Sequence, residues 1–245
     1  MPQESAAPTT PAPSAGGFRE PGLGRLSLAG FLLLVAGVAG ALGEIPRWGP
    51  CLDEIYGPAC VAGQEHELYA AVLPGPAWIG DPVASLLHGL ALLCIAASIA
   101  LWGAGRLNPV WRAVLVCSTA CLGLLTAAPA LLGYGLAVNT AAEAVLIWAM
   151  PVLFLLACLW SGPGGSRPAS RWVLVLLLAG VLISPLPQWV IGIVITGHHD
   201  TPPGYGLVQA VPMAVIGIAA LAGATARMLA ATGRRRAGAR RGAVT

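Results

Sequence analysis

The sequence carries very little charge, and none of its basic residues is a lysine. Charged residues make up 9% of the 245 residues, whereas hydrophobic residues make up 57%. A soluble domain would carry about 25% charged residues to cover its surface. This shortage of charge excludes a soluble globular protein, and the net charge of +3 is too small to indicate binding to nucleic acid.

Several signatures of catalysis and cofactor binding are also missing. The chain has no Walker motif, no rhomboid-type serine motif with a late histidine, and no pair of histidines inside apolar segments to hold a haem. It has no C-x-x-C motif in a loop that would support thiol exchange. The sequence therefore assigns neither a reaction nor a substrate, and the catalytic residues, if any, stay unassigned.

The apolar residues instead form long runs that are almost free of charge. Each run is close to the roughly 20 residues that a helix needs to cross a hydrocarbon core about 30 Å thick. The runs show no alternation of polar and apolar residues, which argues against strands, and helices satisfy their own backbone amides in lipid. The sequence predicts an all-α polytopic membrane helical bundle with six transmembrane helices, at 26–43, 83–103, 113–133, 141–160, 172–196 and 207–226.

The arginines and the acids separate between alternate loops. Twelve of the thirteen arginines lie in the two tails or in the loops after spans two and four, whereas eight of the ten acids lie in the opposite loops. Positively charged loops stay on the cytoplasmic side of a membrane. We therefore expect a multi-pass plasma-membrane protein with both its N-terminus and its C-terminus in the cytoplasm.

Three regions follow from this topology. Residues 1–25 are rich in Pro, Ala, Ser and Thr and are predicted to form a disordered cytoplasmic tail. Residues 26–232 form the transmembrane domain, with a long outer loop over 44–82, and residues 233–245 form a basic cytoplasmic tail. The expected partners are the lipid bilayer and other membrane subunits, and not nucleic acid.

The long outer loop contains two cysteines. Cys51 and Cys60 are separated by eight residues that include the turn sequence YGP. Thiols outside the cytoplasm oxidise and stay oxidised. The sequence therefore predicts a structural disulfide between these two residues.

The fifth predicted span contains the sequence ISPLPQW. Pro185 and Pro187 lack amide hydrogens and bias the residues before them away from helical angles. Gln188 follows directly and can donate to a carbonyl that has lost its partner. The pattern predicts a helix break, which is either a packing kink with local repair or an ion or substrate site like those of transporters.

Small residues in the first and last spans predict close helix packing. Gly37 and Ala41 are four residues apart, as are Ala219 and Gly223. Small residues at this spacing let two membrane helices approach closely. We expect contacts within one chain rather than a dimer face.

Polar side chains gather at the outer ends of several predicted spans. Asp81, Ser85 and His88 lie on one helical stripe, and Gln209 lies at the same level of the last span. We expect the loop after span five to close over spans two and four and to bring one of its histidines near His88 and a carboxylate. The candidate outer-face site consists of Asp81, Ser85, His88, Glu143, His198, His199 and Asp200.

Two classes of function fit this pattern. The first is a small permease or an accessory subunit, whose acidic outer vestibule would concentrate a cation or a cationic solute. The alternative is a metal-dependent membrane enzyme, because two histidines and one carboxylate suit a divalent metal such as zinc or iron.

Overall fold

The regular elements of the protein are α-helices. The computed structural model describes residues 22–54, 57, 58, 60, 82–104, 107–132, 145, 149–157, 194 and 207–242, and no strand occurs among them. The described long helices are α1 (Leu23–Asp53), α3 (Pro82–Trp102), α4 (Pro109–Leu132) and α8 (Leu207–Gly242). Each contains a stretch that is long and apolar enough to cross a membrane. The all-α class is thus confirmed.

These four helices match the first, second, third and sixth predicted spans. The structure describes only part of the predicted span 141–160, namely residues 145 and 149–157, which are helical. Of the span 172–196 it describes Val194 alone, so the helix break at 185–188 lies outside the described residues. The total of six spans therefore stays a prediction, and so does the disorder of the N-terminal tail.

α4 begins earlier than the sequence pattern predicted because its start is capped. The side-chain Oδ1 of Asn108 accepts a hydrogen bond from the amide of Val110 at 2.9 Å. Asn is a favoured N-cap residue, and the proline that follows, Pro109, suits the first helical position because its missing amide hydrogen is not needed there. The helix thus starts four residues before the predicted span at residue 113.

α1 extends beyond the predicted end of its span. Its 31 residues correspond to a length of about 46 Å at about 1.5 Å per residue, more than a hydrocarbon core requires. The apolar part is Leu23–Pro46, and the helix continues through the start of the predicted outer loop to Asp53. Two buried residues hold this extension in place. Glu44 contacts His88 of α3 and Cys51 forms a disulfide with Cys60, and each is only 4% exposed.

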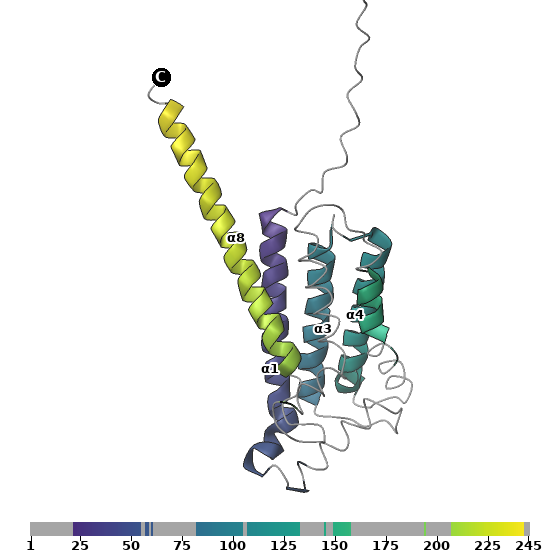
Figure 1. The fold of residues 1–245 in the computed structure, drawn as a ribbon. Coiled ribbons are helices and arrows are strands. Elements are labelled where there is room, and N and C mark those ends of the chain that lie inside the picture. The colour runs from purple at the N-terminus through teal and green to yellow at the C-terminus, as the bar shows by residue number, and fades with distance from the viewer. Residues whose placement is uncertain are drawn as a thin grey trace, which may run out of the picture.

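α8 also extends past its apolar part. Its membrane-spanning stretch is Leu207–Ala230, but the helix has 36 residues and ends at Gly242. The C-terminal half of α8 projects beyond the ends of the other helices (Figure 1). The basic tail predicted over 233–245 is therefore a continuation of the last helix for most of its length.

The four long helices pack in the order α8, α1, α3, α4, so α1 packs against both α8 and α3, and α3 packs against both α1 and α4 (Figure 1). α1 and α3 run antiparallel. Near one end of the pair, the hydroxyl of Ser98 donates to the carbonyl oxygen of Ala29 at 3.1 Å. Near the other end, the ring of His88 lies against Gly43.

α1 and α8 cross through small residues. A Cβ added at Gly37 would lie 2.5 Å from the amide nitrogen of Ala214, and one added at Gly217 would lie 2.5 Å from that of Leu34. The two backbones therefore touch, as small residues in membrane helices allow. Among the described residues, a Cβ added at Gly223 has nothing within 4 Å, so α1 does not contact α8 at this position.

The helical turns at 149–157 pack into the core of the bundle. Met150, Phe154 and Ala157 are fully buried at 0% exposure, and their spacing places them on one helical face. They share one apolar core with buried residues of all four long helices. The hydroxyl of Ser118 on α4 lies 3.9 Å from the sulfur of Met150. This part of the predicted fourth span thus lies against the bundle.

The antiparallel packing separates the described charges between two ends of the bundle. The start of α1, the start of α4 and the second half of α8 lie at one end, and they carry Arg25, Arg112 and Arg227. Glu44 lies toward the opposite end, on the second half of α1, which also carries Arg47 and Asp53, and Glu54 follows the last residue of the helix. The charge asymmetry of the sequence is therefore also an asymmetry of the fold.

Candidate functional site

Glu44 is the one buried carboxylate among the residues that the structure describes. It lies on α1 near the end of the apolar stretch Leu23–Pro46, and its exposure is 4%. An ionised carboxylate in such a place is costly unless it is paired and hydrogen-bonded. The identity of its partner therefore decides what this residue can do.

One partner of Glu44 is His88 of α3. The Nε2 atom of His88 lies 2.8 Å from Oε1 of Glu44. The other ring nitrogen, Nδ1, lies 2.8 Å from the carbonyl oxygen of Ala84, one turn earlier in the same helix. Both ring nitrogens are thus engaged, and the ring is held in one orientation.

Gly43 makes room for this ring. A Cβ added at Gly43 would lie 2.7 Å from Cε1 and 2.8 Å from Nδ1 of His88. Real Cβ atoms do not approach other atoms so closely, so a side chain at this position would displace the imidazole. The sequence Gly43-Glu44 therefore supplies both the space for the histidine and the group that binds it.

The two hydrogen bonds determine how many protons the pair carries. A carbonyl oxygen can only accept, so Nδ1 of His88 donates its hydrogen to Ala84. The contact between Nε2 and Oε1 then needs one further hydrogen, which belongs either to the imidazolium or to the carboxylic acid. In both forms the pair has no net charge, which lowers the cost of placing it in a membrane.

A small cavity lies beside the pair, between α1, α3 and α8. Its volume is about 50 Å³, and its polar lining residues are His88 and Gln209. Such a volume admits a few water molecules or one small ion. The rest of the lining is apolar and comes from Ala36, Gly40, Ala91, Leu92, Ile95, Ala210 and Met213.

The structure describes only part of the candidate site that the sequence predicted. His88 lies at the pair, and Ser85 lies one turn before it on α3, half-buried. Gln209, which the sequence placed at the same level, lines the cavity. The remaining candidates, and with them the predicted contact of the outer loop with His88, lie outside the described residues: Asp81, Glu143, His198, His199 and Asp200.

Glu44 was missed because the first predicted span ended at Gly43. An acid directly after an apolar run looks like the first residue of a solvated loop. One signal was present, because Glu44 directly follows the first predicted span and His88 lies near the start of the second, so the ends of two consecutive spans bring both residues to the same level of the bundle. A search for acid and histidine at the facing ends of consecutive spans would have found the pair.

The divalent metal site is not tested by these residues. Within the described part of the chain, no group of three or more His, Cys, Asp or Glu side chains is close enough to hold a metal ion. The predicted ligand set draws on the loop after span five, which is not described. A metal at this site therefore stays a prediction.

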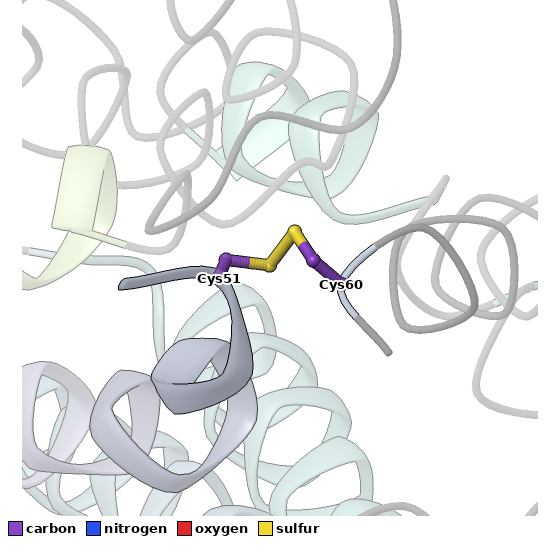
Figure 2. The surroundings of a disulfide bond; sticks show 2 residues. All are labelled: Cys51 and Cys60. Atoms are coloured by element: carbon purple, nitrogen blue, oxygen red, sulfur yellow. A yellow bond between two sulfur atoms is a disulfide. The ribbon is translucent and has the colours of Figure 1, made fainter. Parts of the chain in front are cut away.

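The predicted disulfide is present at the end of α1. Cys51 and Cys60 are joined with their Cα atoms 4.8 Å apart, as Figure 2 shows. Both residues are buried, at 4% and 1% exposure. The bond ties the chain that follows α1 back to the helix, two turns beyond Glu44.

Four apolar helices with a buried polar pair near one end are compatible with an integral, multi-pass membrane protein. The chain matches no protein-family model, no curated protein and no solved structure. The function must therefore be inferred from the chemistry of the site itself.

Proposed function

We propose that this protein is a small permease of the plasma membrane that takes up a small cation or cationic solute from the outer side. The single observation that carries the proposal is the buried pair of Glu44 and His88 beside a cavity. Ionisable groups within membrane spans are rare, face cavities or partners, and mark the pathways of ions and substrates. In this proposal both termini are cytoplasmic and the pair faces the outside.

The charge of the outer loops supports the same direction. Eight of the ten acids belong to segments on the predicted outer side, with Arg47 as the only arginine there. An acidic surface around a narrow opening raises the local concentration of cations. A cation attracted in this way would find polar side chains, those of His88 and Gln209, in the cavity between α1, α3 and α8.

The proposal is tested by transport into liposomes. The full chain is reconstituted, and uptake of radioactive sodium, rubidium and methylammonium is measured against protein-free liposomes. We expect uptake of at least one probe, and its loss in Glu44→Gln. The matched control is Glu54→Gln, which removes an exposed carboxylate ten residues further along the chain and should leave uptake unchanged.

One outcome would contradict the permease, and another would contradict the role of the buried pair. Uptake equal to that of empty liposomes for all three probes would remove the proposed activity. In that case, recovery of the protein from membranes in a fixed ratio with another membrane protein would favour the accessory subunit instead. Equal uptake by Glu44→Gln and the unsubstituted protein would show that the buried pair is not on the pathway.

A further inference from the structure

The part of α8 that follows its apolar stretch is strongly basic. This basic extension, residues 231–242, continues the helix after Ala230. Its charged residues are all arginines, namely Arg234, Arg235, Arg236, Arg240 and Arg241, and α8 as a whole contains no acid. Like charges so close together repel one another, and no acid one turn away offsets them. The basic extension therefore needs anions from outside its own helix.

The described part of the protein does not supply these anions. Its acids are Glu44, Asp53 and Glu54, on α1 or directly after it. They lie toward the end of the bundle opposite to the basic extension (Figure 1). At the start of the extension Gly233 is exposed, and a Cβ added there meets no described residue within 4 Å. Within the described residues, the extension thus projects away from the bundle with its charge unbalanced.

The continuity of α8 places the basic extension next to the surface of the bilayer. Arg234 follows the end of the apolar stretch at Ala230 by four residues, which is about 6 Å at about 1.5 Å per residue. The headgroup region on each side of the hydrocarbon core is about 5–8 Å deep. The first arginines of the extension therefore lie near the level of the lipid phosphates, and a guanidinium is well suited to bind phosphate.

We propose that the basic extension binds a membrane surface that contains anionic phospholipids, and that it does so through Arg234, Arg235 and Arg236. Arg240 lies six residues beyond Arg234, which is about 9 Å further along the helix. Attraction between charges in water at physiological salt is screened over about 8 Å. Arg240 and Arg241 therefore contribute less than the first three arginines.

This contact is independent of transport and agrees with the expected orientation. The cytoplasmic leaflet is the one that carries the anionic lipids, and the C-terminus is predicted to be cytoplasmic. Arg25 of α1 and Arg112 of α4 lie at the same end of the bundle. A lipid surface fits better than nucleic acid, because the membrane adjoins the extension through the helix itself and the whole chain has a net charge of only +3.

The proposal is tested with the full chain in phosphatidylcholine vesicles. A trace of spin-labelled phosphatidylglycerol or spin-labelled phosphatidylcholine is added, and electron spin resonance measures the fraction of each that is held at the protein. We expect phosphatidylglycerol to associate several-fold more strongly. Sodium chloride at about 1 M, which shortens the screening length to about 3 Å, should weaken this preference. The variant Arg234→Gln/Arg235→Gln/Arg236→Gln should lose most of it.

Two further variants separate the position of the charge from its chemistry. Arg240→Gln/Arg241→Gln removes charge from the same helix but further from the membrane, and it should keep most of the preference. Arg234→Lys/Arg235→Lys/Arg236→Lys keeps the charge at the proposed level, and it should keep the preference as well. All of these residues lie beyond the apolar stretch of α8, and gel filtration and circular dichroism establish that each variant is folded.

Three outcomes would overturn the proposal. Equal association of the two labelled lipids with the unsubstituted protein would show that the extension does not bind an anionic surface, and would favour a soluble acidic partner. A preference that persists in the glutamine variant of Arg234, Arg235 and Arg236 would assign the lipid contact to other arginines, such as Arg25 and Arg112. An equal loss in Arg240→Gln/Arg241→Gln would refute the assignment to the first three arginines. None of these results bears on the permease, because no transport is measured.

Discussion

Glu44 and His88 depend on each other for their stability in the membrane. His88→Leu leaves a buried carboxylate without the imidazole, and breaking a buried pair in this way costs about 3–5 kcal/mol. Replacing both residues with apolar ones of similar size is often close to neutral. We therefore expect His88→Leu to lower the thermal midpoint of unfolding in detergent, and the double variant Glu44→Leu/His88→Leu to recover most of the loss.

The control for this pair of variants is Ser85→Ala, one turn earlier on α3 and half-buried. It should change the midpoint little. If the double variant were less stable than His88→Leu alone, the two residues would stabilise the fold independently, and their coupling would be refuted.

The sequence predicted one half of this pair and not the other. His88 stood out because it is a histidine within an apolar run. Glu44 did not, because the end of a hydropathy run shows where apolar side chains stop and not where a helix or a buried contact stops. The spacing places both residues near the same level, but the 2.8 Å contact also needs the space left by the missing side chain at Gly43, and composition does not show which glycine faces a partner.

The disulfide between Cys51 and Cys60 is a residue-scale feature that the sequence did predict, because thiols outside the cytoplasm and a short loop with a turn are enough to indicate it. Closing a loop of this length stabilises a chain by about 2–3 kcal/mol. Cys51→Ser/Cys60→Ser should therefore lower the thermal midpoint and raise protease cleavage after α1. Cys117→Ser, which alters an exposed free cysteine of α4, should do neither.

Peptide mapping without reduction gives a direct reading of the same bond. We expect the peptides that contain Cys51 and Cys60 to be linked in the protein isolated from membranes. Alkylation of both thiols without prior reduction would rule out the disulfide, and would also indicate that this segment faces the cytoplasm.

At the scale of elements, the crossing of α1 and α8 depends on glycine in one place and not in another. Gly37→Ala would drive a Cβ into the backbone of Ala214, and overpacking of this kind costs about 1–3 kcal/mol. Gly223→Ala, on the partner helix, meets none of the described residues within 4 Å and gains about 1 kcal/mol of helix propensity. Thermal unfolding in detergent should show a lower midpoint for the first and an unchanged or higher midpoint for the second.

Equal effects of Gly37→Ala and Gly223→Ala on the thermal midpoint would mean that α1 and α8 do not pack against each other at Gly37 in detergent.

The sequence predicted which helices exist, but not how they pack. The apolar runs predicted the existence of α1, α3, α4 and α8, since length and hydropathy are enough for that. They could not indicate which glycines face a partner, because α8 has glycines both where it contacts α1 (Gly217) and where no described residue lies nearby (Gly223).

Helix ends depended on local chemistry that hydropathy does not detect. α4 starts where it does because the side chain of Asn108 caps its first turn and a proline occupies the first helical position. Neither residue is apolar enough to be counted in a hydropathy run. α1 and α8 continue beyond their apolar stretches to Asp53 and Gly242. Helical backbone hydrogen bonds form in water as well as in lipid, so a helix can extend past the end of an apolar run. The loops predicted from the apolar runs therefore began too early or ended too late, because the helices extend further than the runs.

At the scale of the whole molecule, the antiparallel helices and the arginines make one testable statement about topology. α1 begins, and α8 ends, at the same end of the bundle, and that end carries the arginines, which stay on the cytoplasmic side. A reporter that is active only outside the cytoplasm is fused after the last residue of each described segment. We expect activity after Glu54 and Leu132, and silence after Ala104 and Gly242.

The fusion after Gly242 carries the most weight, because it also tests the number of spans. Between α4 and α8 the chain must cross the membrane an even number of times for α8 to begin outside and end inside, as the predicted spans 141–160 and 172–196 require. A silent reporter at Gly242 together with an active one at Leu132 excludes an odd number of spans and agrees with six. An active reporter at Gly242 would mean that one of these two segments does not cross, and it would place the six arginines from Arg227 onward on the outside, against the charge asymmetry on which the orientation depends.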